Sequence, residues 1–221
     1  MRVATYNIHS CRGRDGRADP HRIAAVLDEL DADVVGLQEV ESCRRRVPDL
    51  DGFGFFQSLA GWHFVPGIAI RDGAGRYGNA LLSRLPVARA RVHALPAGGL
   101  EPRCFIEAEI GGVQVLVTHL SLAPRMRAAQ VNRIAACLRG PRAVAVGDFN
   151  EWNPLSRCFR PLAGLAAPRT GATWPSRRPV LRLDRLFGVT SAAVHDSPLA
   201  RAASDHLPVV GVVPDHDRAS G

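Results

Sequence analysis

The chain has 221 residues, enough for one domain with a substantial core, and we predict a single domain over residues 1–213. Its composition is 46% hydrophobic and 22% charged, which excludes a disordered chain. The formal charge is +7, all 28 basic residues are arginine, and no apolar run reaches the roughly 18 residues of a transmembrane helix.

The chain opens with the pattern strand, helix, strand. Residues 2–8, RVATYNI, form the first strand-like run. Asp19 and Pro20 are an N-cap residue and a first-turn proline, and apolar residues from Ile23 to Leu30 recur at i, i+3, i+4 and i+7. Residues 33–40, DVVGLQEV, suit a buried strand. This order is typical of an α/β fold.

The middle of the chain is rich in strands. GNALLSRLPV, ARARVHAL, RCFIEAEI and VQVLVTHL follow one another from residue 78 to residue 120, and Gly111-Gly112 between the last two is a hairpin signal. This part of the sheet is therefore expected to be antiparallel. A helix after Pro124 and a strand at 143–150, AVAVGDFN, come next, and VLRLDRLF and LPVVGVV are two further strand candidates.

The charge and the cysteine content of the chain bear on its binding partners and its cellular compartment. Two interpretations of the arginines stay open, a solvated surface without a partner and a positive surface that collects an anionic substrate. Five cysteines without a C-x-x-C pair argue against disulfides and a zinc knuckle. The sequence begins without the apolar core of a signal peptide. We expect a cytoplasmic protein whose last residues, 214–221, form a disordered tail.

Polar side chains stand at the ends of six apolar runs. In sheet-based enzymes, sites collect at strand ends because the sheet fixes the residues while loops leave them accessible. A single such residue is more often a turn residue or a polar cap, so the repetition is the signal. The residues are Asn7, Glu39, His119, Asp148 with Asn150, Asp184, and Asp205 with His206.

The motifs around these residues resemble a known family. In chain order they are YNIH, LQEV, YGNALLSRLPV, VTHL, GDFN, LDRLF and SDHLP. The chain is similar to the endonuclease/exonuclease/phosphatase (DNase I-like) superfamily, and most of all to its small bacterial members. The resemblance implies an α/β fold, a four-layer sandwich with two face-to-face mixed β-sheets flanked by helices. It also implies a divalent-metal-dependent phosphoesterase site at one edge of the sheets.

The resemblance implies a metal site. Glu39 corresponds to the principal metal ligand, with Asn7 beside it, and Asp205 helps at the metal or at the attacking water. Oxygen ligands without cysteine suit a hard cation, so we expect Mg²⁺ as the cofactor, with Mn²⁺ as a substitute.

The resemblance also implies a set of catalytic residues. Asp148 and Asn150 are expected to orient the attacking water, with Asp148 accepting its proton; an extended segment would turn both side chains to one side and Phe149 to the other. His119 and His206 correspond to the histidines that contact the scissile phosphate. Asp184 corresponds to the carboxylate that bonds His206 and favours its charged form.

For each of three further residues, two interpretations stay open. Asn79 either contacts the phosphate or bonds the backbone. Arg103 begins a strand where some family members place a phosphate-contacting arginine, although a coincidence is easy among 28 arginines. His9 lies two residues after Asn7 on the same face of an extended strand, near the metal or simply at the surface.

Together these features predict an enzyme that hydrolyses a phosphodiester by in-line attack of water on phosphorus. We expect a phospholipid headgroup or a small phosphodiester as substrate, with DNA cleavage as the alternative and an inactive binding module as a third. No obligatory protein partner is evident. The aromatic segment FGFFQSLAGWHF, 53–64, is expected to pack in the core, with an exposed aromatic lip at lipid headgroups as the alternative.

Overall fold

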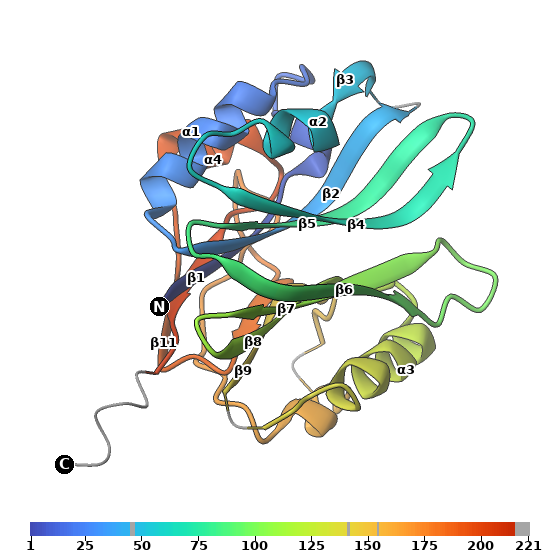
Figure 1. Ribbon diagram of the computed structural model, residues 1–221, viewed down its shortest axis with the longest axis vertical. Coiled ribbons are helices and arrows are strands. Elements are labelled where there is room, and N and C mark those ends of the chain that lie inside the picture. Colours follow the sequence, from blue (N-terminus) through green and yellow to red (C-terminus); the bar gives the residue numbers. More distant parts are fainter. Residues whose placement is uncertain (45–46, 141, 154, 215–221) are drawn as a thin grey trace.

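The structure is a computed structural model that describes residues 1–44, 47–140, 142–153 and 155–214. Two β-sheets are stacked face to face, with α1, α2 and α4 against one outer face and α3 against the other (Figure 1). This arrangement confirms the predicted α/β sandwich. The tail predicted over 214–221 lies outside the described residues, apart from Pro214.

The two sheets are both mixed. The first has the order β11 (Ser191–Val194), β12 (Val209–Val212), β1 (Arg2–Asn7), β2 (Val34–Arg44), β5 (Gly75–Ser83) and β4 (His63–Asp72), and β3 (Val47–Asp51) pairs with β2. The second has the order β10 (Asp184–Phe187), β9 (Ala143–Asp148), β8 (Val113–His119), β7 (Arg103–Ile110) and β6 (Val87–Leu95).

The helices are short. They are α1 (Pro20–Leu30), α2 (Gly52–Gln57), α3 (Pro124–Ala135) and α4 (Pro198–Ala203), with 3₁₀ turns η1 (His9–Cys11) and η2 (Arg160–Leu162). The longest described helix, α3, has 12 residues, whereas a helix that crosses a bilayer needs about 20.

Local sequence signals explain the predicted elements. Asp19 caps α1 by accepting a hydrogen bond from the His21 N–H, and Pro20 fills the first turn. Gly111 and Gly112 have φ of +57° and +71°, the left-handed pair that a two-residue hairpin between β7 and β8 requires. Both predictions are therefore confirmed.

Strand direction brings the polar strand ends to one edge. β8 and β9 are parallel, with His119 opposite Asp148, and β10 runs antiparallel to β9, with Asp184 opposite Asp148. β1 ends at Asn7, whose side chain reaches Asp148 across the two sheets. Asp184 therefore belongs to the same edge because its strand begins there rather than ends there.

Three strand predictions were wrong in their extent. The run predicted at 78–87 divides between β5, which ends at Ser83, and β6, which begins at Val87. The strand predicted at 143–150 ends at Asp148, because Asn150 adopts a left-handed φ of +51°. The strand predicted at 180–187 begins at Asp184. In the aromatic segment, Phe53 and Phe56 are fully buried in the core cluster beneath the helices, which confirms core packing for these two rings.

The inner faces of the two sheets approach closely at Gly36. A Cβ atom at this position would lie 2.7 Å from Val117 Cγ1 and 2.9 Å from Val146 Cγ2, below the contact distance of two carbon atoms. Glycine is therefore required in β2 because the facing sheet leaves no room for a side chain.

We predict that Gly36→Ala lowers the free energy of unfolding by about 1–3 kcal/mol, because the added methyl group overpacks the space between the sheets. Urea denaturation measures the change. The matched control is Gly73→Ala, where a Cβ meets nothing within 4 Å, and we expect it to change stability by no more than about 0.5 kcal/mol. Equal stability of the two variants would contradict the close approach.

Candidate active site

A cavity of about 730 Å³ opens at the edge where β1, β8 and β9 end. Most of the residues predicted for the site line it: Glu39, Arg103, His119, Asp148, Asn150, Asp205 and His206. Asn7 and Asp184 are not among the lining residues, but they form hydrogen bonds to residues that line the cavity. Asn79 is missing from the described lining residues, and its amide nitrogen donates to the carbonyl of Cys104 at 3.0 Å.

Asp148 is the centre of the site. Its side chain is buried at the end of β9, where Oδ2 accepts a hydrogen bond from Asn7 Nδ2 at 3.0 Å and Oδ1 accepts one from the Asn150 N–H at 2.9 Å. Burial raises the pKa of Asp148 to about 6, although the His206 cation and these two hydrogen bonds oppose the rise. The carboxylate is therefore ionised at neutral pH and remains close to its titration range.

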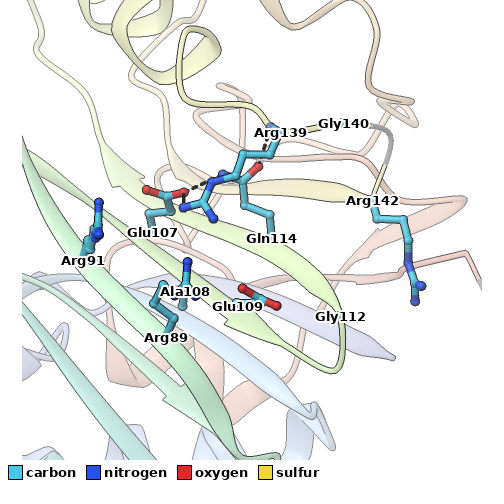
Figure 2. A pocket seen from close by; sticks show the side chains of 10 residues that line it. All are labelled: Arg89, Arg91, Glu107, Ala108, Glu109, Gly112, Gln114, Arg139, Gly140 and Arg142. Carbon is cyan, nitrogen blue, oxygen red and sulfur yellow. Dashed lines mark hydrogen bonds and ion pairs between the residues drawn. The ribbon is translucent and has the colours of Figure 1, made fainter.

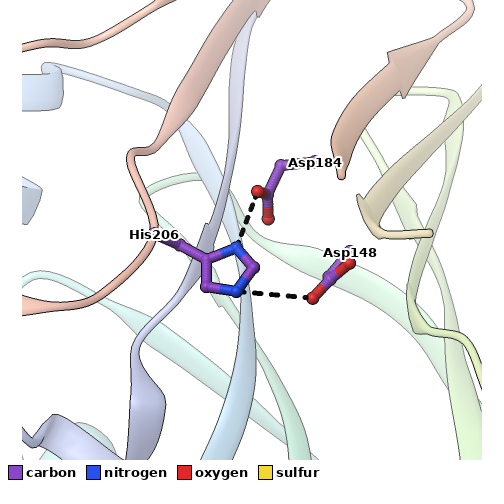
Figure 3. A group of neighbouring side chains, drawn as sticks. All are labelled: Asp148, Asp184 and His206. Atoms are coloured by element: carbon purple, nitrogen blue, oxygen red, sulfur yellow. Dashed lines mark hydrogen bonds and ion pairs between the residues drawn. The ribbon is translucent and has the colours of Figure 1, made fainter. Parts of the chain in front are cut away.

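One histidine next to Asp148 is a cation. His206 Nδ1 donates to Asp184 Oδ2 at 2.8 Å, which turns Nε2 toward Asp148 Oδ2 at 3.8 Å (Figure 3). Burial alone would lower the pKa of His206, but the carboxylates of Asp184 and Asp148 raise it to about 10. The Thr173 hydroxyl also donates to Asp184 and fixes that carboxylate.

The other histidine is neutral. His119 Nε2 lies 3.5 Å from Asp148 Oδ2, and Nδ1 lies 2.9 Å from an Arg103 guanidinium nitrogen. A guanidinium has donors and no acceptor, so His119 Nδ1 must accept and its proton must be on Nε2. Burial and the Arg103 cation hold the pKa of His119 well below its usual range. Two chemically different imidazoles therefore face one carboxylate.

Asn7 ties Asp148 to Glu39. Its amide nitrogen donates to Glu39 Oε1 at 3.1 Å as well as to Asp148, and its amide oxygen accepts the His9 N–H at 3.1 Å. Glu39 is directed into the cavity by a bulge in β2, where the register with β5 shifts and φ is +59°.

Asp205 also lines the cavity. Its Oδ2 accepts a hydrogen bond from Trp174 Nε1 at 3.1 Å, whereas its buried Oδ1 has no hydrogen-bond partner among the described residues. His9 Nδ1 lies 3.7 Å from that oxygen. A buried carboxylate oxygen without a donor suits a cation, so the donor chemistry of Asp205 and Glu39 fits a hard divalent ion.

A second grouping of potential ligands is Asp148, Asp184 and His206, whose ligand atoms lie within 4.8 Å of one another. All three residues are buried. Here the His206 Nδ1 proton is already bound by Asp184, so in this state the group is a hydrogen-bonded ion network.

Backbone strain concentrates at the site. Seven described residues other than glycine have positive φ; two of them, Glu39 and Asn150, line the cavity, and a third, His9, lies 3.7 Å from the lining residue Asp205. Such conformations cost energy unless the surrounding structure compensates for them, and they collect at functional sites. The Asn150 side chain illustrates the compensation, because its amide nitrogen donates to the carbonyl of Leu120 at 2.8 Å.

Sequence reasoning missed several residues of the site. Glu41, Tyr77 and Trp174 line the cavity, and Thr173 supports Asp184 from behind. Glu41 directly follows the LQEV motif, and this position in the sequence could have identified it as a residue of the site. The segment of Thr173 and Trp174 lacks strand or helix periodicity, so its place beside Asp184 depends on the folding of a long loop.

A smaller cavity of about 370 Å³ lies on the outer face of the second sheet, between β6, β7, β8 and the loop after α3 (Figure 2). Its buried carboxylate, Glu107, is satisfied by Gln114 Nε2 at 2.7 Å and by the Arg139 guanidinium. It contains none of the motif residues.

Comparison with known proteins agrees with this geometry. The model of the endonuclease/exonuclease/phosphatase family matches residues 4–206. The Escherichia coli K12 protein YbhP, itself uncharacterized, is 30% identical over 240 residues, which cover 95% of this chain and 94% of YbhP.

Solved structures share the fold. An endonuclease/exonuclease/phosphatase from Beutenbergia cavernae has a TM-score of 0.75 at 26% identity, over 96% of this chain and 70% of that one. An AP endonuclease from Archaeoglobus fulgidus has a TM-score of 0.72 at 20% identity, over 97% and 100% of the two chains. The 3'-5' exonuclease NExo from Neisseria meningitidis reaches 0.71 at 20% identity, over 97% and 100%. These likenesses confirm the predicted DNase I-like fold.

We predict that ¹⁵N NMR distinguishes the two histidines at pH 7.5. His206 will be protonated on both nitrogens, because its pKa of about 10 keeps it charged, and His119 will show an unprotonated Nδ1 and a protonated Nε2. Replacing each histidine in turn assigns the signals. In Arg103→Met, His119 should no longer be restricted to the tautomer with its proton on Nε2, while the His206 signals stay unchanged. A His119 that is doubly protonated in the parent protein would contradict the assignment.

Proposed function

Because the chain belongs to the endonuclease/exonuclease/phosphatase family, whose members hydrolyse phosphoesters, we propose that it is a Mg²⁺-dependent phosphodiesterase. The observation that carries the proposal is the buried, ionised Asp148 between a cationic His206 and a neutral His119. This set combines a proton acceptor with two donors at one cavity wall, which is what water attack on phosphorus requires.

In the proposed reaction, water attacks phosphorus in line with the departing alcohol oxygen. Asp148 accepts the proton of the attacking water. Asn150 fixes the loop beside Asp148 through its hydrogen bond to the Leu120 carbonyl. The new O–P bond forms as the bond to the leaving alkoxide breaks, and the alkoxide takes a proton from solvent water and departs as the alcohol. The Nε2–H groups of His206 and His119 donate to the phosphate oxygens, where negative charge increases. Asp184 keeps His206 charged and correctly turned.

The proposed metal ligands are Glu39, Asn7 and Asp205. Mg²⁺ is held in proteins by few carboxylates and retains several waters, so this small donor set suits it, and Mn²⁺ would substitute. A bound divalent ion supplies Lewis-acid stabilisation of charge on the phosphate oxygens. Asn79 is proposed to bond the backbone, since its amide nitrogen donates to the Cys104 carbonyl, and Arg103 is proposed as the partner of His119. His9 is proposed to lie near the metal, because its Nδ1 is 3.7 Å from Asp205.

The proposed substrate is a phospholipid headgroup or another small phosphodiester. Of the two guanidinium groups that line the cavity, Arg44 pairs with Asp72 at 2.9 Å and Arg103 pairs with Glu101 at 2.8 Å. A nucleic-acid strand needs unpaired cations along its backbone path, and the described cavity wall offers few. The alternative, DNA cleavage, is favoured by the fold shared with an AP endonuclease and with NExo, which has also been solved bound to a DNA hairpin.

We further propose that residues 1–213 act as one cytoplasmic domain. The two sheets share one buried cluster between their inner faces, and the five cysteines are all free, as in a reducing compartment.

A substrate panel tests the proposal. Bis-p-nitrophenyl phosphate, p-nitrophenyl phosphate, plasmid DNA and phospholipid micelles are incubated with the protein and Mg²⁺, Mn²⁺ or EDTA. We expect hydrolysis of the diester and the lipid that EDTA abolishes. Asp148→Asn should lower the rate by about 10²–10⁴, because the proton acceptor is lost.

The matched control is Asp28→Asn, whose carboxylate is exposed on α1 and which should leave the rate unchanged. Turnover by Asp148→Asn at the parent rate would overturn the assignment, as would inactivity of the parent protein on every substrate.

A further inference from the structure

Of the seven large hydrophobic side chains that are exposed among the described residues, two line the cavity and two more belong to loops that carry lining residues. Leu122 and Trp152 line the cavity and are 74% and 64% exposed. Leu155 follows Trp152 in the same loop, and Val180 precedes the lining residue Leu181. We call Leu122, Trp152, Leu155 and Val180 the apolar rim. Exposed apolar groups gathered at the mouth of a cavity mark a surface that meets an apolar partner.

The rim residues belong to three separate segments, and each segment also carries an exposed arginine. Arg125 follows Leu122, Arg157 follows Leu155, and Arg178 precedes Val180. No hydrogen bond or ion pair joins these three guanidinium groups to a described residue. Each segment therefore offers an apolar side chain and an unpaired positive charge within three residues.

We propose that the apolar rim docks the cavity onto the surface of an anionic phospholipid bilayer or micelle; this rests on the proposed phosphodiesterase function. Apolar side chains enter the boundary between headgroups and acyl chains, while arginines bind the lipid phosphates. The tryptophan is suited to this boundary because its ring is amphipathic. Docking would present a headgroup phosphodiester to Asp148 without extracting the lipid from its layer.

The charges at the cavity argue for a lipid surface over a nucleic-acid strand. The described cavity wall carries more carboxylates than guanidinium groups, and both guanidinium groups are paired. A strand that crossed the cavity would bring its phosphates close to these carboxylates. A membrane meets only the rim, where the free arginines are, and admits one headgroup at a time.

The rim also differs from the aromatic segment at 53–64. There Phe53 and Phe56 are buried, whereas Trp152 is exposed beside the cavity. The membrane contact is therefore assigned to the loops after β8 and β9 and to the loop before β10.

Vesicle binding tests the proposal independently of turnover. The full chain is mixed with vesicles of phosphatidylcholine, with or without about a third phosphatidylglycerol, in EDTA, and bound protein is measured by sedimentation. We expect binding to the anionic vesicles that falls as salt rises. Leu122→Ser/Trp152→Ser should weaken binding about tenfold or more, because two apolar side chains no longer leave water.

Trp152 supplies a direct signal. The fluorescence difference between the parent protein and Trp152→Phe should shift to the blue when anionic vesicles are added, since the ring enters a less polar medium. The matched control is Val92→Ser, which removes an exposed hydrophobic side chain, 46% exposed, from the edge strand β6 and should bind as the parent does. Circular dichroism confirms that each variant is folded.

The outcomes separate this proposal from the proposed function. Hydrolysis of soluble bis-p-nitrophenyl phosphate without vesicle binding would overturn the membrane contact and leave the phosphodiesterase intact. Equal binding by the parent and Leu122→Ser/Trp152→Ser would also overturn it. A Trp152 signal that responds to single-stranded DNA and not to vesicles would assign the rim to base stacking instead.

Discussion

A buried carboxylate at the junction of the two sheets is the constraint on which the rest of the structure depends. Asp148 has almost no exposure to solvent, and an unpaired charge in such a place would be very costly. Three of its partners come from segments distant in sequence: Asn7 at the end of β1, His119 at the end of β8 and His206 before β12. The fourth, the Asn150 N–H, follows two residues after it. The face-to-face stacking of the sheets is what brings these segments together.

The two histidines differ in protonation state because the Nδ1 atom of each ring has a different partner. Asp184 stands behind His206 and stabilises its charge, whereas burial together with Arg103, which stands behind His119, excludes a charge there. An identical pair of cations would neutralise Asp148 more strongly and lower its basicity. The unequal pair leaves one cation and one neutral donor around a carboxylate with a pKa of about 6, a suitable value for accepting a proton at neutral pH.

Much of the fold and of the site could be predicted from the sequence, because strand periodicity, the capped helix α1 and the Gly111-Gly112 hairpin are local signals. The polar residues that end or begin apolar runs could be found for the same reason. The bulge that turns Glu39 into the cavity could not, since it depends on the register with β5. Nor could the pairing of His119 with Arg103, because which partner stands behind a histidine is decided by packing between strands.

The pH dependence of kcat/KM for bis-p-nitrophenyl phosphate tests the central claim most directly. Asp148 must be ionised to accept a proton, so activity is present above its pKa of about 6 and falls as pH decreases through that value. His206 must be charged, so activity falls again as pH rises through its pKa of about 10. Asp184→Asn should move this upper limb to lower pH, because the carboxylate that raises the pKa of His206 is gone. A profile that is flat through the acid range, or an upper limb that Asp184→Asn leaves in place, would contradict the account.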